Sequence, residues 1–232
     1  MDAVVMGAGE GQRMRPLTER WPKPVLPIDG RPVLSTLLRE LASAGLTRVS
    51  VVTGHLAEQV EALVGDGSGF GLEVSFVRQP RPDGSADTVV RALAAGARTP
   101  LLVTGADTLF APGDIGRFRA RFEGSQAAGA VAVRREPPPS PPHRFAVRIR
   151  DGRVQRLLDD DPVNPLAGAP LWVIGEQLVP LLEGLPGPPF ELADVLQRGV
   201  DRGEEVLGFE IGPTRDLTNP LDLVKENFPY LR

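Results

Sequence analysis

The sequence predicts an α/β protein with a Rossmann-like, mostly parallel mixed sheet, helices on both faces of that sheet, and a small β-rich part in the second half. In the first half of the chain, short apolar runs alternate with segments whose apolar residues recur at helical spacing. This alternation is typical of parallel sheets with both faces covered. After Ala130 the segments instead look like pieces of sheet. The 232 residues, 41% hydrophobic and 24% charged, suit one globular domain.

The first half opens with a strand over Asp2 to Met6 that runs directly into the glycine-rich stretch Gly7 to Gly11. A helix is expected from Pro32 to Ala44, because the leucines and valine of this stretch lie three and four residues apart and Gly45 follows as a stop. The other elements expected here are strands over 49–52, 72–77 and 101–104 and helices over 56–64 and after Gly84.

The second half is expected to add strands and two closing helices to the same sheet. The expected strands cover 131–133, 145–149 and 154–158, and the helices cover about 191–202 and 220–228. Asp151-Gly152 is a hairpin signal between the last two strands. The stretch Pro137 to Pro142 contains five prolines and predicts an exposed, polyproline-like loop, with a partner-docking motif as the alternative.

Composition excludes several classes of function. The chain has no cysteine and two histidines, His55 and His143, which excludes thiolate chemistry and leaves carboxylate oxygens as the expected metal ligands. The net charge of −4 argues against a broad nucleic-acid-binding face. Because no apolar run reaches the length of a membrane span and the N-terminus lacks the features of a signal peptide, we expect a cytoplasmic protein without a membrane partner.

The loop from Gly7 to Arg15 is a candidate phosphate-binding loop. Its glycines leave consecutive backbone N–H groups unobstructed, as close approach to a polyphosphate requires. The spacing matches neither the dinucleotide fingerprint nor a Walker loop, because Gln12-Arg13 follow Gly11. An ordinary tight turn is the alternative interpretation of the glycines alone.

Cations and prolines continue this loop. Arg13, Arg15 and Lys23 are interleaved with four prolines, which stiffen the segment and lower the entropic cost of holding cations around an anion. Lys23 and Lys225 are the two lysines of the chain, whereas the other 24 basic residues are arginines. A retained lysine suggests a need for its compact ammonium group. A solvated basic loop is the alternative to a triphosphate site.

These residues resemble the signature of the sugar-1-phosphate nucleotidylyltransferases, in a short form without a β-helix domain. The matching motifs are Gly7-Ala8-Gly9-Glu10-Gly11-Gln12-Arg13-Met14-Arg15-Pro16-Leu17-Thr18, Pro22-Lys23-Pro24, Leu26-Pro27-Ile28-Asp29-Gly30-Arg31-Pro32, Gly65-Asp66-Gly67 to Gly71, Gln79 with Gly84-Ser85-Ala86, Gly105-Ala106-Asp107 and Arg215-Asp216-Leu217-Thr218-Asn219-Pro220-Leu221-Asp222-Leu223. They cover the chain from end to end. The resemblance implies one nucleotidyltransferase domain over 1–232, with a nucleotide-binding half (1–130) and an acceptor-binding and closing half (131–232).

The resemblance also implies roles for individual residues. Arg13 would contact the triphosphate and Lys23 would bridge the two reacting phosphates. Asp107 and Asp216 would hold Mg²⁺. The residues implied to bind the nucleotide are Ala8, Gly9, Gly11, Gln79, Gly84 and Ser85, with Gln79 and Gly84 at the edge of the base. The implied substrates are an NTP, with UTP or dTTP favoured by the Gln79 amide, and a sugar 1-phosphate. A homo-oligomer is compatible with the sequence.

Physical chemistry agrees with this set of residues. A Mg²⁺ ion takes one or two carboxylates together with phosphate oxygens. The alternative for Asp107 is a turn or helix-capping residue, and for Asp216 a cap or a surface charge. No general base is expected, because a sugar phosphate has a second pKa of roughly 6 and is already an anionic nucleophile near neutral pH.

The sequence departs from the family pattern in the second half. Where a Glu-Lys-Pro motif is usual, this chain has Leu158-Asp159-Asp160-Asp161-Pro162, so the lysine that would contact the sugar phosphate is missing. Either Arg144 or Arg148 replaces it, or the acceptor sits differently. Two alternatives to a sugar nucleotidylyltransferase therefore stay open, namely a nucleotidyltransferase with a non-sugar phosphorylated acceptor and a catalytically silent regulatory homologue.

Overall fold

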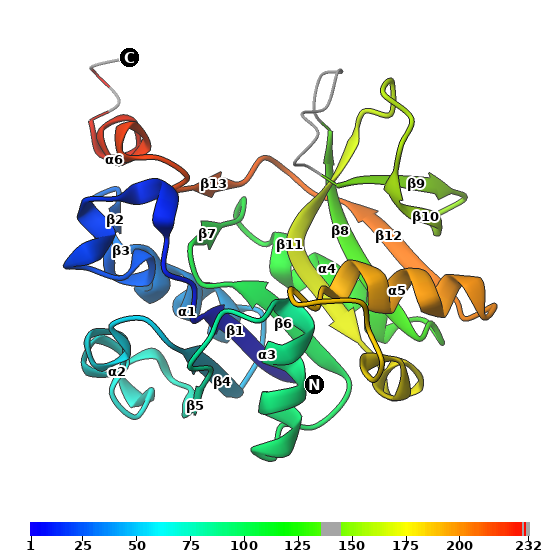
Figure 1. Ribbon diagram of the computed structural model, residues 1–232, viewed down its shortest axis with the longest axis horizontal. Helices are drawn as coiled ribbons and strands as arrows, with labels where there is room; N and C mark the ends of the chain where they lie inside the picture. The colour runs from blue at the N-terminus through cyan, green and yellow to red at the C-terminus, as the bar shows by residue number, and fades with distance from the viewer. Residues whose placement is uncertain (136–144, 229, 231–232) are drawn as a thin grey trace.

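The computed structural model describes residues 1–135, 145–228 and 230. Within these residues, nine strands form one sheet in the order β5-β4-β1-β6-β11-β8-β12-β10-β9, seen in Figure 1 with helices in front of it. Helices cover both faces of the sheet, so the predicted α/β class is confirmed. The loop predicted over Pro137 to Pro142, with His143 and Arg144, lies outside the described residues.

Parallel strands make up the side of the sheet formed by the first half of the chain. These strands are β1 (Asp2–Gly7), β4 (Arg48–Thr53), β5 (Glu73–Arg78) and β6 (Leu101–Gly105). β1 pairs with both β4 and β6, and β4 pairs with β5. Because the strands are parallel, their C-terminal ends meet at one edge, and the loops that follow them share that edge.

The second half of the chain extends this sheet. Its strands are β8 (Gly129–Arg135), β9 (Ala146–Arg150), β10 (Arg153–Asp159), β11 (Leu166–Ile174) and β12 (Val206–Glu210). β11 joins the two halves, because it pairs antiparallel with β6 on one side and with β8 on the other. The predicted Asp151-Gly152 hairpin is confirmed: both residues have positive φ, as a tight two-residue turn requires, and β9 pairs with β10 across it.

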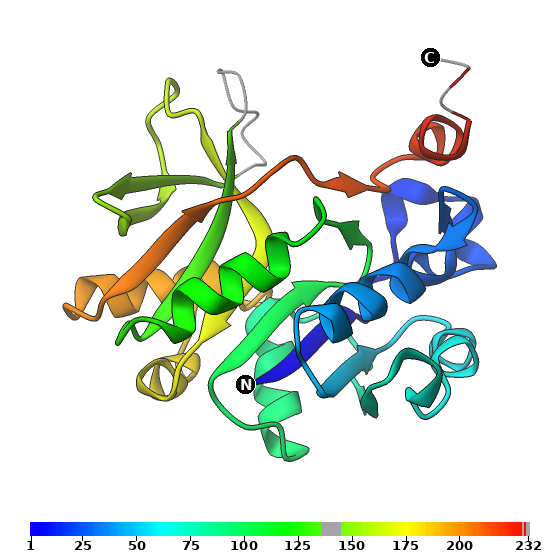
Figure 2. The ribbon, with the colours of Figure 1, turned by 180° about the vertical axis from the view of Figure 1, so that it is seen from behind.

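The two faces of the sheet carry separate hydrophobic cores, because neighbouring residues of a strand point to opposite faces. Val5 of β1 packs in one core and Val4 in the other, both fully buried. Helices α1 (Val33–Ser43), α2 (Ala57–Val64) and α4 (Asp114–Glu123) cover the first face, and α3 (Ser85–Ala94) and α5 (Leu192–Asp201) cover the second. Figure 1 is seen from the α3 and α5 side, and Figure 2 shows α1 and α4 on the other. Each fully buried Val or Leu contributes roughly 1.5–3 kcal/mol.

Several elements were absent from the sequence-based expectations. Helix α4 and strands β11 and β12 have no predicted counterpart. Gly116 interrupts the apolar pattern of α4, and Gly168 and Pro170 interrupt that of β11. The remaining elements are β2 (Pro27–Ile28), β3 (Arg31–Pro32), β7 (Thr108–Leu109), β13 (Arg215–Asp216), α6 (Pro220–Asn227) and the 3-10 segments η1 (Gln12–Met14), η2 (Leu17–Glu19), η3 (Lys23–Val25), η4 (Ser68–Phe70) and η5 (Glu176–Leu182).

In the part of the chain that the structure describes, no helix combines the length and apolar character needed to cross a bilayer.

Glu40 of α1 is a half-buried acid whose Oε2 has no hydrogen-bond partner among the described residues. Burial raises its pKa from the ordinary 4.5 to about 7, and a hydrogen bond from the Phe110 backbone opposes that shift only in part. The folded chain therefore holds this proton more tightly than the unfolded chain does. The stability that this group contributes is complete below about pH 4.5 and is lost as the pH rises through about 7.

We predict that Glu40→Gln raises the melting temperature at pH 8 and changes it little at pH 5. The reason is that glutamine imitates the protonated acid, which the wild-type chain already contains at pH 5. Thermal unfolding at the two pH values measures the effect, with Glu204→Gln on an exposed turn as the control. An equal shift at both pH values would show that the effect does not come from the Glu40 proton.

Candidate active site

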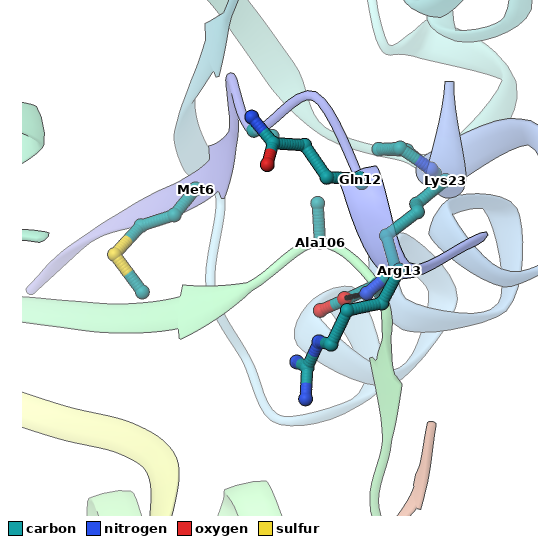
Figure 3. A pocket seen from close by; sticks show the side chains of 10 residues that line it. Met6, Gln12, Arg13, Lys23 and Ala106 are labelled. Carbon is teal, nitrogen blue, oxygen red and sulfur yellow. Dashed lines mark hydrogen bonds and ion pairs between the residues drawn. The ribbon is translucent and has the colours of Figure 1, made fainter. Parts of the chain in front are cut away.

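A cavity of about 380 Å³ lies at the C-terminal edge of β1 and β6. The residues that line it are Met6, Gly7, Gly9, Gly11, Gln12, Arg13, Lys23, Pro24, Ala106 and Asp107. Figure 3 shows Met6 on one side and Lys23 on the other, with Ala106 between them and Gln12 and Arg13 extending from the loop. The structure thus brings five of the predicted site residues together around one cavity, namely Gly9, Gly11, Arg13, Lys23 and Asp107.

The glycines of the loop answer two different needs. Gly11 has φ +62°, and a Cβ there would lie 2.9 Å from side-chain carbons of both Lys23 and Thr18, so Gly11 lets the loop pack against Lys23. A Cβ at Gly9 would meet no protein atom within 4 Å. The space over Gly9 is therefore part of the cavity, and protein packing does not explain a glycine at this position.

The loop is braced from outside the cavity. Thr18 Oγ1 donates to the Gly11 carbonyl at 2.9 Å, and His55 Nε2 donates to the Thr18 carbonyl at 2.6 Å. Ala8, predicted to contact the nucleotide, is 6% exposed and does not line the cavity; its carbonyl accepts from the His55 backbone. His55, to which the sequence analysis gave no role, thus connects two parts of the loop.

An ion pair joins the loop to the sheet. Lys23 Nζ donates to Asp107 Oδ2 at 2.6 Å, although the two residues are 84 positions apart. Lys23 begins η3, and Asp107 is the second residue after the end of β6. Their side chains are 16% and 30% exposed, so the pair faces the cavity while protein covers most of it. Such a partly buried, charge-assisted hydrogen bond is stronger than a surface ion pair.

Arg13 is the cation of the loop that is left for a ligand. It is exposed and lines the cavity, and within the described residues it makes no hydrogen bond or ion pair. Arg15, by contrast, pairs with Glu10 at 3.2 Å and does not line the cavity. A planar guanidinium that lines the same cavity as an open glycine loop is suited to bind phosphate oxygens.

The second acid of the predicted metal pair reaches the same edge of the sheet through a short strand. β13 pairs antiparallel with β7, and this register places Asp216 opposite Thr108, the residue that follows Asp107. Asp216 Oδ1 accepts from Thr218 Oγ1 at 3.0 Å. Within the described residues, Asp107 Oδ1 and Asp216 Oδ2 take no hydrogen bond. Two carboxylates with unused hard oxygens fit a Mg²⁺ ion that receives its other ligands from phosphate and water.

A network of ion pairs holds β13 in place. Arg215 donates to both carboxylate oxygens of Asp29 at 2.5 and 2.8 Å and to Glu226 Oε2 at 2.5 Å. Hydrogen bonding to Asp29, and then to Glu226, raises the pKa of Arg215 above its already high ordinary value. Helix α6 begins with a capping box formed by Asn219 and Asp222. Residues from the two ends of the chain thus fix the strand that carries Asp216.

The residues predicted to read the base lie elsewhere. Gln79 is 3% exposed, and its Nε2 donates to the Gly84 carbonyl and to Asp87 while its Oε1 accepts from Thr88. The amide therefore orders the turn before α3, and its contact with a base stays a prediction. Gly84 is required for packing, because a Cβ there would lie 2.2 Å from the Phe190 carbonyl.

Ser85 lines a second cavity, of about 560 Å³, beside the first. The other lining residues are Met6, Phe145, Ala146, Leu158, Asp159, Trp172, Glu191, Ala193 and Asp194. Met6 lines both cavities, so the two adjoin at the end of β1. Apart from Ser85, the sequence analysis singled out none of these residues as a site residue, because they come together only when β9, β10, β11 and α5 pack beside α3.

Arg148, one of the two arginines considered as a replacement for the missing lysine, has a different partner. Its Nε and Nη2 donate to Asp159 at 3.2 and 2.7 Å, and Asn164 Nδ2 donates to the same carboxylate at 2.8 Å. The Asp159 side chain is fully buried. Arg148 therefore neutralises Asp159 in this structure, and Arg144 lies outside the described residues.

Comparisons with known proteins agree with this geometry. The low-salt glycan biosynthesis nucleotidyltransferase Agl11 of Haloferax volcanii is 27% identical over 240 residues, which cover 98% of this chain and 65% of that protein. The glucose-1-phosphate thymidylyltransferase of Streptomyces griseus is 29% identical over 236 residues, with the same coverage of each chain. This chain thus spans 65% of the length of both relatives.

The fold is shared with a solved structure, the UDP-glucose pyrophosphorylase from Acinetobacter baumanii. The TM-score is 0.81 at 22% identity, covering 97% of this chain and 91% of that one. The family model described as "Nucleotidyl transferase" matches residues 2–160, which include the glycine-rich loop, Lys23 and Asp107. Because this match covers more than half of the sequence, the protein belongs to the nucleotidyl transferase family.

Proposed function

We propose that this chain transfers a nucleotidyl group from an NTP to a sugar 1-phosphate, forming an NDP-sugar and pyrophosphate. The observation that carries the proposal is the first cavity, where an open glycine, the free Arg13 guanidinium and the Lys23–Asp107 ion pair face one space. The name of the Streptomyces griseus relative supports a sugar 1-phosphate as acceptor and dTTP as donor. UTP is the other donor favoured by the sequence.

The reaction exchanges one phosphoanhydride bond for another. An oxygen of the acceptor phosphate attacks the α-phosphorus of the NTP, the bond from the α-phosphorus to the bridging oxygen breaks, and pyrophosphate leaves with that electron pair. The nucleophile is an anion, because the second pKa of a phosphate monoester is roughly 6. The protein therefore has to align two anions rather than remove a proton, and alignment supplies up to roughly 7–11 kcal/mol in favourable cases.

Different residues of the cavity would contribute to this alignment in different ways. Backbone N–H groups around Gly9 and Gly11 and the Arg13 guanidinium would bind the triphosphate. The Lys23 ammonium lies between the loop and the end of β6, where it would neutralise charge on the reacting phosphates. Asp107 and Asp216 would hold Mg²⁺, which supplies positive charge to the phosphate oxygens.

A phosphorylated acceptor other than a sugar is the second candidate. The observation that favours it is the Asp159 region, where Asp159 to Asp161 stand in place of a Glu-Lys-Pro motif and Arg148 is engaged by Asp159. A regulatory homologue that binds nucleotide without turnover would retain the same cavity. A transferase of either kind releases pyrophosphate, whereas the regulatory homologue does not.

The test is pyrophosphate release in the presence of Mg²⁺ across the NTPs, each paired with a panel of sugar 1-phosphates and other phosphorylated acceptors. We expect release that depends on one donor and one acceptor, with at least about a hundredfold loss in Asp107→Asn, because the variant loses the charge that pairs with Lys23 and that would hold the metal. A thermal shift with NTP verifies that the variant is folded. An NTP that raises the melting temperature without pyrophosphate release from any pair would contradict the transferase and favour the regulatory homologue.

A second prediction concerns Gly9. We expect Gly9→Ala to raise the KM for the NTP about tenfold or more, because the added methyl group would enter the space assigned to phosphate, while the melting temperature stays nearly unchanged. Gly69→Ala is the matched control, since its added Cβ also meets no atom within 4 Å but lies far from the cavity, in η4. An unchanged KM in Gly9→Ala would remove the loop from the triphosphate site.

A further inference from the structure

The second cavity is placed to hold the part of the acceptor that does not react. It shares Met6 with the first cavity, so a molecule whose phosphate lies beside Lys23 can extend into it. Its volume of about 560 Å³ exceeds the 380 Å³ of the first cavity. Residues from both halves of the chain line it, and Figure 1 shows α3 and α5 over the same face of the sheet.

The charge of this cavity is one-sided. Asp159, Glu191 and Asp194 are among its lining residues, although the Asp159 side chain itself is fully buried, and none of the lining residues that the structure describes is lysine or arginine. Arg148 neutralises Asp159, and Asn164 donates a further hydrogen bond to the same carboxylate. Glu191 is partly satisfied, because Ser85 donates to its Oε2 through both the hydroxyl and the backbone N–H.

Asp194 is the acid of this cavity for which the described residues provide no partner. It lies in the first turn of α5, it is half-buried, and within the described residues its carboxylate has no hydrogen bond and no ion pair. The helix N-terminus offers it a favourable dipole but no neutralising charge. A half-buried carboxylate that faces a cavity and lacks a cation favours a positively charged ligand.

The walls of the cavity fit such a ligand. Phe145 and Trp172 line it, and aromatic faces attract cationic groups. Met6, Leu158 and Ala193 provide further apolar surface, so the cavity combines a carboxylate with largely apolar walls.

Resting on the proposed function, we propose that the acceptor carries a positively charged amino group, which Asp194 binds in the second cavity while the phosphate end of the acceptor binds beside Lys23. An acceptor that is anionic at its reacting end and neutral elsewhere would bring its negative charge toward an uncompensated carboxylate. An acceptor with an ammonium group matches the cations of the first cavity at one end and the acid of the second at the other. Amino sugar 1-phosphates and aminoalkyl phosphates or phosphonates share this chemistry.

Two matched pairs of acceptors test the proposal and distinguish amino sugar 1-phosphates from aminoalkyl phosphates or phosphonates. Glucosamine 1-phosphate is compared with glucose 1-phosphate, and 2-aminoethylphosphonate with ethylphosphonate, each with the NTP that the chain binds. The readouts are kcat/KM from pyrophosphate release and, independently of turnover, the Kd of each acceptor in the presence of a non-hydrolysable NTP analogue. We expect the amino member of one pair to be preferred at least about a hundredfold. The pair that shows this preference identifies the class of the acceptor, an amino sugar 1-phosphate or an aminoalkyl phosphonate.

The variant Asp194→Asn should reduce that preference at least about tenfold, mainly through KM and Kd, because it removes the charge but keeps the shape. Asp201→Asn, at the other end of α5 and outside both cavities, is the matched control and should leave the preference unchanged. Equal use of both members, or a preference that Asp194→Asn leaves intact, would overturn the proposal and assign Asp194 to hydroxyl groups. If pyrophosphate release fails for all acceptors while the Kd values still show the preference, the proposed reaction fails and the cationic site stands.

Discussion

The ion pair between Lys23 and Asp107 is the contact on which the geometry of the site depends. It fixes the end of a long irregular loop to the C-terminal end of β6, so that the glycines, Arg13 and the acid surround one cavity. Gly11 permits this arrangement, because any side chain there would collide with Lys23 and Thr18. A lysine in a chain with 24 arginines fits the same constraint, since a compact ammonium group takes up less space than a guanidinium between the loop and Asp107.

The geometry of the site also depends on the sheet, which brings its residues to one edge. Because β1, β4, β5 and β6 are parallel, the loops that follow β1 and β6 leave the sheet at one edge. The pairing of β13 with β7 then brings Asp216 to that edge from a distant part of the sequence, and Arg215 holds it there through Asp29 and Glu226. The candidate metal ligands thus depend on contacts between the two ends of the chain.

Much of the fold could be predicted from periodicity. The four parallel strands, α1, α2, α3 and α5 agree with the expected ranges, because each carries an apolar pattern of the appropriate period next to a glycine or proline signal. β11, which joins the two halves, was missed because Gly168 and Pro170 break its pattern and its pairing with β6 and β8 is a long-range property.

The site residues also fall into those that the sequence indicated and those that only the packed fold brings together. A dense local motif indicated Gly9, Gly11, Arg13 and Lys23, and the family resemblance implied Asp107; the structure brings these residues together. Gln79 shows the limit of this approach, because its amide is used inside the protein in a way that no sequence pattern reports. Met6, Trp172 and Asp194 lie on three different elements, and their common cavity exists only after those elements pack.

The most direct test of this account is a double-mutant cycle on Lys23→Ala and Asp107→Asn, read as kcat/KM for nucleotidyl transfer. If the ion pair positions the reacting groups as one unit, each single variant should lose most of the activity, and the double variant should be little worse than the poorer single one. The coupling would then exceed about tenfold, or about 1.4 kcal/mol. Losses that multiply in the double variant would contradict the account, because they would show that Lys23 and Asp107 act independently.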